Sequence, residues 1–273
     1  MRRYRFAGGK AIVTGAASGI GEALARDLGS RGSSLVLLDR DAAGLTRVRE
    51  DLSSKHPGVS VTTVTADLSD RDGTDRIGAQ LAAHHPDTTL LINCAGVALG
   101  GTFDQVSLQD FNWLFDINFH AAVTLTHHLL PTLRRNPGSH LVNVSSVYGL
   151  FAPSGQAAYA SSKFALRGFT ESLRAEAEAW NLGVSCVHPG GIKTAIASNA
   201  RIGARLSPGD AQKSVDNINR SLTISPSDAA EIILRGVERR KPRVLIGLSA
   251  NIPDVIVRIA PGNYMRILRH LSD

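Results

Sequence analysis

The run Lys10-Ala-Ile-Val-Thr14-Gly15-Ala-Ala-Ser18-Gly19-Ile-Gly21 decides the fold of this 273-residue chain. Its apolar start predicts a buried strand, its glycines predict a tight turn, and the Glu22-Ala-Leu-Ala-Arg-Asp-Leu that follows predicts a helix. Glycine lets the backbone approach a ligand closely, and the free N–H groups at the start of a helix attract a pyrophosphate. The spacing departs from G-x-G-x-x-G, so a tight turn without a ligand is the alternative interpretation.

A second predicted strand, residues 34–38, ends at an acidic residue. Asp39 stands eighteen residues beyond Gly21, where a carboxylate accepts hydrogen bonds from the ribose of an adenosine. That carboxylate repels a 2′-phosphate, which favours NAD as the cofactor. Arg40 follows directly and is able to pair with such a phosphate, so NADP stays open.

Tyr159 and Lys163 stand one helical turn apart. Residues at i and i+4 share a helix face, so we expect the ammonium to lie beside the phenol and to favour its ionised form. A free tyrosine titrates near pH ~10, which is too high for efficient proton exchange at neutral pH. A nearby cation lowers that pKa, which makes Tyr159 a candidate acid/base. The same pairing also occurs on helix surfaces without any catalytic role.

Further strands are predicted at residues 59–65, 90–93, 140–144, 184–187 and 243–246, with helical stretches between them. This alternation predicts an α/β fold with a doubly wound parallel sheet of about seven strands and helices on both faces. Ligands bind at the carboxyl ends of such strands, where the motifs lie. The length and the hydrophobic content of 43% suit a single domain over residues 1–273.

Taken together, the motifs resemble those of the short-chain dehydrogenases/reductases, the SDR superfamily, in its single-domain branch with a Rossmann-like fold. The residues that carry the resemblance are Thr14-Gly15-Ala-Ala-Ser18-Gly19-Ile-Gly21, Asp67, Asn93-Cys94-Ala95-Gly96, Asn118, Ser146, Tyr159, Lys163 and Pro189-Gly190 with Thr194. The thirteen-residue step from Ser146 to Tyr159 is the usual one in the family. Cys94 departs from it, since many members carry an asparagine there, and this puts a stabilising hydrogen bond in doubt.

The resemblance implies an NAD(P)-dependent enzyme that interconverts a secondary alcohol and a ketone or aldehyde. Tyr159 would exchange a proton with the substrate oxygen, and Ser146 would hydrogen-bond the same oxygen. Lys163 would hold the nicotinamide ribose and lower the pKa of the phenol. Asn118 would hold a water that links Lys163 to solvent.

The resemblance also implies the contacts of the dinucleotide. Three groups would bind its adenosine half, namely Gly15, Ser18, Gly19, Ile20 and Gly21 at the pyrophosphate, Asp39 and Arg40 at the ribose, and Asp67 and Leu68 at the adenine. Two groups would surround its other half, namely Asn93, Ala95 and Gly96 under the second ribose and Pro189, Gly190, Ile192 and Thr194 at the nicotinamide. We predict no metal site, because the histidine pairs 84–85 and 127–128 are adjacent and point apart.

Substrate choice is expected in the least family-like segments, above all a lid over residues 195–225. Its apolar members are Ile196, Ile202, Leu206 and Ile218, and Phe151 adds apolar bulk near Tyr159. They favour a hydrophobic substrate of lipid, steroid or aryl type. One alternative is a 3-ketoacyl reductase of lipid metabolism, which usually needs NADPH. Another is a non-catalytic dinucleotide-binding protein, which would not need the four catalytic positions.

The basic residues behind the charge of +6 are scattered and no nucleic-acid module is visible, so a small-molecule substrate is expected and a nucleic-acid partner is not. Attraction for anionic substrates or lipid headgroups is the alternative meaning of this charge. Aromatic residues of the helical stretches 108–134 and 156–180 favour a homodimer or homotetramer, and a role in the core of the monomer is the alternative. The tail 250–273 ends in a basic amphipathic helix with Tyr264, Ile267, Leu268 and Leu271 on one face. It is able to cap the pocket, pack on a partner subunit or rest on a membrane.

Cys94 and Cys186 lie in or beside predicted buried strands, which favours a reducing compartment over a disulfide scaffold. No apolar segment of a secretion signal follows the basic start, and no apolar run is long enough to span a bilayer. The expected location is therefore cytoplasmic.

Overall fold

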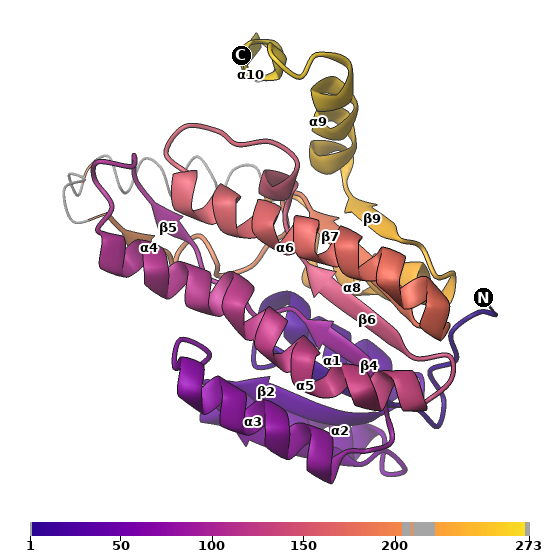
Figure 1. Ribbon diagram of the computed structural model, residues 1–273. Helices are drawn as coiled ribbons and strands as arrows, with labels where there is room; N and C mark the ends of the chain where they lie inside the picture. Colours follow the sequence, from indigo (N-terminus) through magenta and orange to yellow (C-terminus); the bar gives the residue numbers. More distant parts are fainter. Residues whose placement is uncertain (1, 204–208, 210–221, 271–273) are drawn as a thin grey trace.

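The computed structural model of the chain describes residues 2–203, 209 and 222–270 (Figure 1). Along the chain, the elements are β1 (Lys10–Thr14), α1 (Gly19–Ser30), β2 (Ser34–Asp39), α2 (Ala42–Lys55), β3 (Val61–Thr65), α3 (Arg71–His84), β4 (Thr88–Asn93), β5 (Leu99–Gly100), α4 (Leu108–Phe115), η1 (Asp116–His120), α5 (Ala121–Arg135), β6 (His140–Val144), η2 (Val147–Gly149), α6 (Ala157–Ala177), η3 (Glu178–Trp180), β7 (Gly183–Pro189), β8 (Arg201–Ile202), α8 (Pro226–Glu238), β9 (Arg243–Ile246), α9 (Leu248–Ile259) and α10 (Tyr264–His270).

Seven strands form one parallel sheet in the order β3-β2-β1-β4-β6-β7-β9. The predicted doubly wound sheet of about seven strands is confirmed. The order reverses between β1 and β4, which is the switch point at which open α/β sheets bind their ligands. The short strands β5 and β8 pair beyond the carboxyl edge of this sheet.

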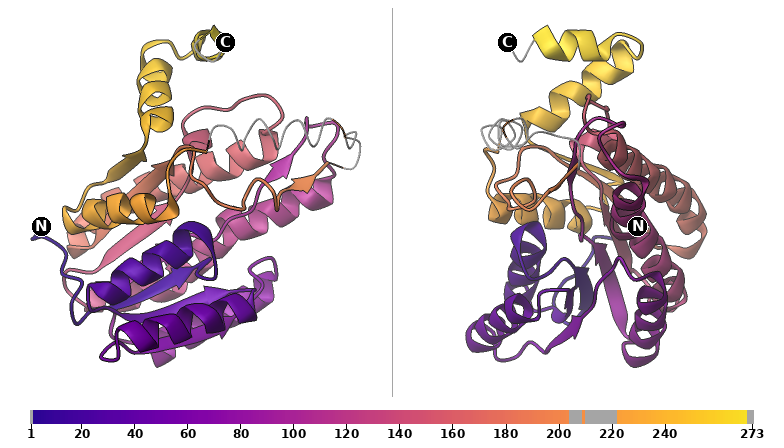
Figure 2. Two further views of the ribbon diagram at one scale, coloured as in Figure 1. Left: turned by 180° about the vertical axis from the view of Figure 1, so that it is seen from behind. Right: turned by 90° about the vertical axis from the view of Figure 1, so that its left-hand side faces the viewer.

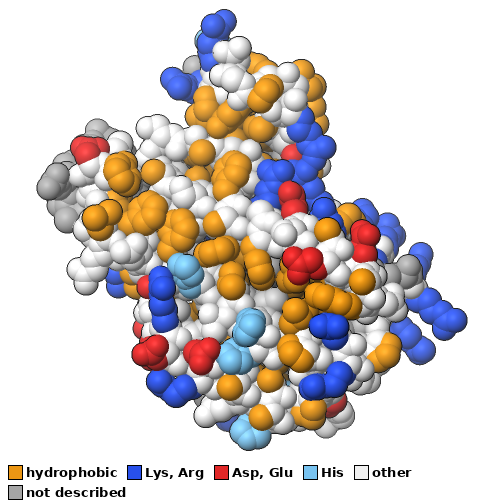
Figure 3. Space-filling view, viewed as in Figure 1, with side chains coloured by type: hydrophobic (Ala, Val, Ile, Leu, Met, Phe, Trp, Pro, Cys, Tyr) orange, Lys and Arg blue, Asp and Glu red, His pale blue; other side chains and the backbone are white. Residues whose placement is uncertain are grey.

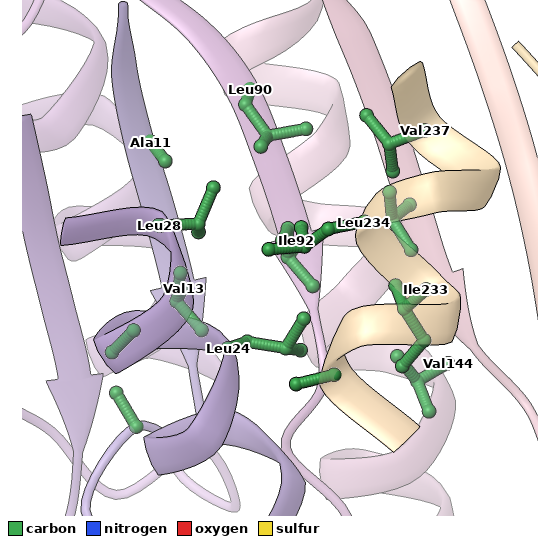
Figure 4. Packing of buried hydrophobic residues seen from close by; sticks show 14 of the residues in the cluster. Ala11, Val13, Leu24, Leu28, Leu90, Ile92, Val144, Ile233, Leu234 and Val237 are labelled. Carbon is green, nitrogen blue, oxygen red and sulfur yellow. The ribbon is translucent and has the colours of Figure 1, made fainter. Parts of the chain in front are cut away.

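The central strands β1, β4, β6 and β7 are buried on both faces, and successive side chains of a strand point to opposite sides. In β1, Ala11 and Val13 belong to one apolar core and Ile12 belongs to the other. Figure 4 shows the first core, where Leu24 and Leu28 of α1 pack near residues of β1, β4 and α8.

Helices cover both faces, as predicted. α1, α2 and α8 supply apolar residues to the first core, and α3, α5 and α6 supply them to the second. Figure 1 is seen from the side of α3, α5 and α6, and the first view of Figure 2 is seen from the side of α1 and α8.

The long helix predicted over residues 108–134 is interrupted. α4 passes into the π-helical turn η1 before α5 begins, so the turn carries one residue more than an α-helix would hold. Functional residues often sit at such turns, and Asn118 lies in this one. In α4 the rings of Phe111 and Phe115 stack with their centroids 5.1 Å apart, while Phe164 of α6 is 38% exposed. Contact between copies through these helices stays a prediction.

Two expected segments extend beyond the described residues. Of the lid 195–225, residues 204–208 and 210–221 lie outside them, Leu206 and Ile218 included, and Leu271 of the tail does too. The apolar face predicted for the last helix is only partly exposed, because Tyr264 and Leu268 are half-buried in α10. Helices α9 and α10 stand away from the sheet (Figures 1 and 2).

Candidate active site

A cavity of about 1030 Å³ lies at the carboxyl ends of the strands. This volume is at the upper end of the usual range for ligand pockets. Most of the predicted site residues line it: Gly15, Ser18, Gly19, Ile20, Gly21, Asp39, Arg40, Asp67, Leu68, Ala95, Gly96, Ser146, Tyr159, Lys163, Pro189, Gly190, Ile192 and Thr194. The structure thus brings together residues that are spread over most of the sequence.

The turn between β1 and α1 requires glycine. Gly15 and Gly19 have φ angles of +69° and +55°, which side chains with a Cβ rarely adopt. A Cβ on Gly15 would lie 2.9 Å from the Cα of Ala95, and a Cβ on Gly21 would lie 2.0 Å from the carbonyl oxygen of Gly15. The backbone of the turn therefore packs against the loop after β4 without space for side chains.

We expect Gly21→Ala to destabilise the chain by about 3 kcal/mol or more, because its Cβ meets rigid backbone. Gly58→Ala is the matched control, because a Cβ there meets no atom within 4 Å. Urea denaturation measures both free energies of unfolding. Equal stability of the two variants would show that the turn opens to accept a side chain.

The start of α1 fits an anion. Ser18 is its N-cap residue, but the Ser18 side chain makes no capping hydrogen bond, whereas the side chain of Asp41 caps α2. The N–H groups in the first turn of a helix have no partner within the helix. At α1 they lie at the cavity wall, where a pyrophosphate would satisfy them.

The Asp39 carboxylate is held in place by the backbone. Its Oδ2 accepts a hydrogen bond from the Ala17 N–H at 3.0 Å, and its Oδ1 accepts one from the Asp41 N–H at 3.1 Å. Each oxygen keeps lone pairs for the hydroxyls of a ribose. Arg40, beside it, is exposed and also lines the cavity. These residues fit the adenosine half of a dinucleotide.

Asp67 lies across the same end of the cavity. Burial raises the pKa of its carboxyl, but hydrogen bonds from the backbone and hydroxyl of Ser69 and the charges of Arg40 and Arg201 outweigh this, so the pKa is lowered overall. The carboxylate is therefore ionised at neutral pH and is able to accept hydrogen bonds.

The loop after β4 is tied to β1 by Thr14, whose hydroxyl oxygen accepts hydrogen bonds from the N–H groups of Cys94 and Ala95, both at 3.0 Å. Asn93 does not line the cavity, contrary to our expectation. Its side chain is buried and donates to the side-chain oxygen of Asn143 at 2.8 Å. The reason is strand parity, because Asn93 faces the same side as Leu91 in the second core.

Tyr159 and Ser146 face one another at the cavity. Burial raises the pKa of Tyr159 to about 12, and a hydrogen bond with the Ser146 side chain opposes this rise. Tyr159 is 9% exposed, so its phenol borders the cavity from a largely buried position. At neutral pH the phenol carries its proton.

Lys163 lies behind this pair. Its Nζ donates to the backbone oxygen of Val144 at 3.1 Å and lies 5.7 Å from the centroid of the Tyr159 ring. Burial lowers the pKa of the ammonium to about 8. The lowered pKa that we expected for Tyr159 is not seen, because burial of the phenol outweighs an ammonium at this distance.

Asn118 supports the loop that follows Gly96. Its Oδ1 accepts from the Val97 N–H at 2.8 Å, and its Nδ2 donates to the Val97 oxygen at 3.0 Å and to the Ser162 hydroxyl at 3.2 Å. A Cβ on Gly96 would lie 3.4 Å from Asn118 Oδ1 and 3.2 Å from Lys163 Nζ, so both groups flank this glycine. Asn118 does not line the cavity, and its expected water contact stays a prediction.

His188 supports the backbone at Ser146. It is fully buried, and its Nδ1 lies 3.0 Å from the backbone oxygen of Ser146, so this nitrogen carries the proton. Burial lowers the pKa of its imidazole to about 4, so the ring is neutral. His188 therefore fixes the backbone that presents the Ser146 hydroxyl.

Trp113 and Arg201 form part of the wall that sequence reasoning missed. The guanidinium carbon of Arg201 lies 3.5 Å from the centroid of the Trp113 ring, and Arg201 also pairs with Asp110 at 2.9 Å. Trp113 belongs to the aromatic residues of the stretch 108–134, for which contact between copies and a role within the monomer were both open. No local pattern links these residues, since β8 brings Arg201 to α4 from a distant part of the chain.

Comparisons with known proteins agree with this geometry. Residues 9–204 match the model of the short chain dehydrogenase family. The chain is 37% identical to SadH of Mycobacterium tuberculosis over 266 residues, which is 96% of this chain and 95% of that protein. It is 31% identical to the dehydrogenase/reductase SDR family member 7B of Danio rerio over 262 residues, 94% of this chain and 83% of that one.

Among solved structures, a short chain dehydrogenase/reductase from Burkholderia phymatum in complex with NAD is similar, with a TM-score of 0.84 and 27% identity over 95% of both chains. The family match covers the glycine turn, the Ser146, Tyr159 and Lys163 cluster and the loop after β7. The chain therefore belongs to the short-chain dehydrogenase/reductase family, whose members are oxidoreductases.

Proposed function

We propose that this chain is an NAD(P)-dependent oxidoreductase that interconverts a secondary alcohol and a ketone or aldehyde, with Tyr159 as the acid/base. One observation carries the proposal: a single cavity is lined at one end by the glycine turn and Asp39, and at the other by Ser146, Tyr159 and Lys163. The NAD complex of the Burkholderia relative supports a nicotinamide dinucleotide in this place.

The dinucleotide would be held by the start of α1 at its pyrophosphate, by Asp39 at its adenosine ribose and by Lys163 at its second ribose. When bound, it supplies or accepts the hydride of the reaction. The loop after β7, from Pro189 to Thr194, would cover the nicotinamide, because its residues line the same cavity.

In the direction of reduction, the protonated phenol of Tyr159 donates its proton to the carbonyl oxygen of the substrate. The Ser146 hydroxyl hydrogen-bonds that oxygen and stabilises the negative charge that develops on it. Below pH about 8 the Lys163 ammonium is charged, and it stabilises the phenolate that Tyr159 becomes. In oxidation the same groups act in reverse, and Tyr159 accepts the proton of the alcohol.

We propose that the enzyme prefers NAD as its cofactor, and a substitution at Asp39 tests this preference. Asp39→Asn keeps an oxygen for the Ala17 N–H but removes the charge that repels a 2′-phosphate. We expect it to shift the ratio of kcat/KM values about a hundredfold toward NADP, because charge-assisted hydrogen bonds to the ribose are lost. Initial rates with both cofactors measure the ratio.

Arg40→Ala is the matched control for the cofactor ratio. Arg40 is the neighbouring cation at the same end of the cavity. Its loss should lower kcat/KM with NADP and leave kcat/KM with NAD close to the wild-type value. An unchanged ratio in Asp39→Asn would place the adenosine ribose away from this carboxylate.

A hydrophobic substrate is supported by the wall opposite the glycine turn. Its apolar members are Trp113, Phe151, Ile196, Met265 and Leu268. A panel of aliphatic, steroid and aryl ketones of increasing size, followed by nicotinamide absorbance with NADH and NADPH, tests the proposed function. Turnover should rise with apolar size. Turnover confined to 3-ketoacyl thioesters with NADPH would favour the ketoacyl reductase, and binding of NADH without any turnover would favour a non-catalytic protein.

A further inference from the structure

Helix α9 turns an apolar stripe toward solvent. The stripe consists of Leu248, Ile252, Val255 and Ile259, which are 75%, 47%, 53% and 78% exposed. Their spacing of four, three and four residues places them on one face of the helix. Few other large apolar side chains among the described residues are as exposed. A contiguous apolar surface of this kind marks a site of interaction.

The opposite face of α9 is fixed against the body of the protein. Ala250, Pro253 and Asp254 are buried there. The Asp254 carboxylate pairs with Arg243 at the start of β9 and lies 3.3 Å from the guanidinium of Arg258. The pair with Arg243 joins α9 to β9 and, together with the burial of Ala250 and Pro253, sets the rotation of the helix, so the stripe is held outward.

The charge around the stripe is positive. Arg258, Arg266 and Arg269 are exposed on α9 and α10. Asp254 is the one acidic residue between positions 247 and 270, and it is buried and paired. Figure 3 shows the result, with apolar side chains gathered over the C-terminal helices and basic side chains around them.

We propose that α9 and α10 dock on the surface of an anionic lipid bilayer. Apolar residues on one helix face with arginines beside them are the features of helices that lie in a membrane interface. Anionic headgroups attract such arginines. Among the described residues, no helix has the length and hydrophobicity to cross a bilayer.

A second copy of the chain fits this surface less well. A two-fold contact brings the same patch of both copies together, so the positive charges of Arg258, Arg266 and Arg269 would be brought near those of the second copy. No exposed carboxylate lies between positions 247 and 270 to offset them. The charge therefore complements a lipid surface and opposes self-association through this patch.

Docking would also place the cavity next to the lipid. Pro253, on the face of α9 opposite the stripe, and Met265 and Leu268 of α10 line the cavity wall. If the proposed function holds, an apolar substrate would reach the cavity from the bilayer without crossing water. Binding to the bilayer itself does not depend on the catalytic assignments.

Co-sedimentation of the full chain with vesicles tests the proposal. We expect binding to phosphatidylcholine vesicles that contain phosphatidylglycerol to be about tenfold or more tighter than to phosphatidylcholine alone, and to weaken with salt. The double variant Ile252→Ser with Ile259→Ser should weaken that binding about tenfold or more, because it removes apolar area from the stripe. Arg266→Gln should weaken binding to anionic vesicles only.

The matched control is Phe103→Ser with Leu108→Ser. Phe103 and Leu108 are 64% and 71% exposed but lie away from the C-terminal helices, so vesicle binding should stay at the wild-type level. Cofactor binding and turnover of a water-soluble ketone should be unchanged in the α9 variant, which separates this proposal from the proposed function.

Vesicle binding that is equal in wild type and the α9 variant would overturn the proposal. So would a fall in molar mass of the α9 variant by light scattering, since a second copy would then cover the stripe.

Discussion

Tyr159→Phe is expected to lower kcat about a thousandfold or more, while the cofactor still binds. In the proposed reaction the phenol hydroxyl exchanges the proton with the substrate, and general acid/base groups contribute rate factors of this order. The ring itself packs with Leu99, Leu114 and Ala158, and phenylalanine keeps that packing. Initial rates measure kcat, and quenching of protein fluorescence by the dinucleotide measures its Kd.

Tyr148→Phe is the matched control for this prediction. Tyr148 also lines the cavity, burial raises its pKa as well, and its ring centroid lies 6.1 Å from that of Tyr159. Loss of the Tyr148 hydroxyl should change kcat by less than about tenfold, because this hydroxyl is not the group that we propose as the proton donor. If kcat falls by the same factor in both variants, the result would contradict the role of Tyr159 as the proton donor.

Lys163→Met is expected to lower kcat/KM for alcohol oxidation about a hundredfold or more. The increase of kcat/KM with pH should also occur at higher pH in the variant than in the wild type. Oxidation needs the phenolate, and the ammonium favours the phenolate. Below pH about 8 the Lys163 ammonium is charged and stabilises the phenolate, so less phenolate is present there without it. The pH dependence of kcat/KM in wild type and variant measures the shift.

Thermal unfolding separates this effect from misfolding. Burial lowers the pKa of Lys163 to about 8, which means that the folded state disfavours its charged form. An apolar side chain of similar length should therefore leave the melting temperature unchanged or raised. A variant with normal stability and an unshifted pH profile would remove Lys163 from the proton relay.

Much of the fold could be predicted because the central strands are buried on both faces. Near-continuous apolar runs such as 34–38 are typical of parallel sheets between two helix layers, and each expected strand is present within a few residues. The glycine turn was predictable for a similar reason, since Gly15 and Gly19 adopt conformations that other residues rarely accept.

The interior of the site was harder to predict, because contacts and burial depend on tertiary packing. Spacing placed Lys163 near Tyr159 but did not show that burial would raise the pKa of the phenol. The π-helical turn at Asn118 leaves no mark in the sequence. Asn93 was predictable in principle, since it shares a strand face with Leu91, which belongs to the second core.

The stripe of α9 is visible in the sequence, but its direction is not. Leu248, Ile252, Val255 and Ile259 have the spacing of a helix face that normally packs on the core. Here the side of Ala250 and Pro253 packs instead, where Arg243 of β9 pairs with Asp254. Only the three-dimensional contacts show which face is covered.

A crystal structure of the chain with NAD and a bound ketone or alcohol is the most direct test of the central claim. We predict the Tyr159 hydroxyl and the Ser146 hydroxyl within about 2.6–3.2 Å of the substrate oxygen, with Lys163 Nζ at the ribose of the nicotinamide. A dinucleotide bound elsewhere, or a Tyr159 hydroxyl that points away from the substrate oxygen, would contradict the account.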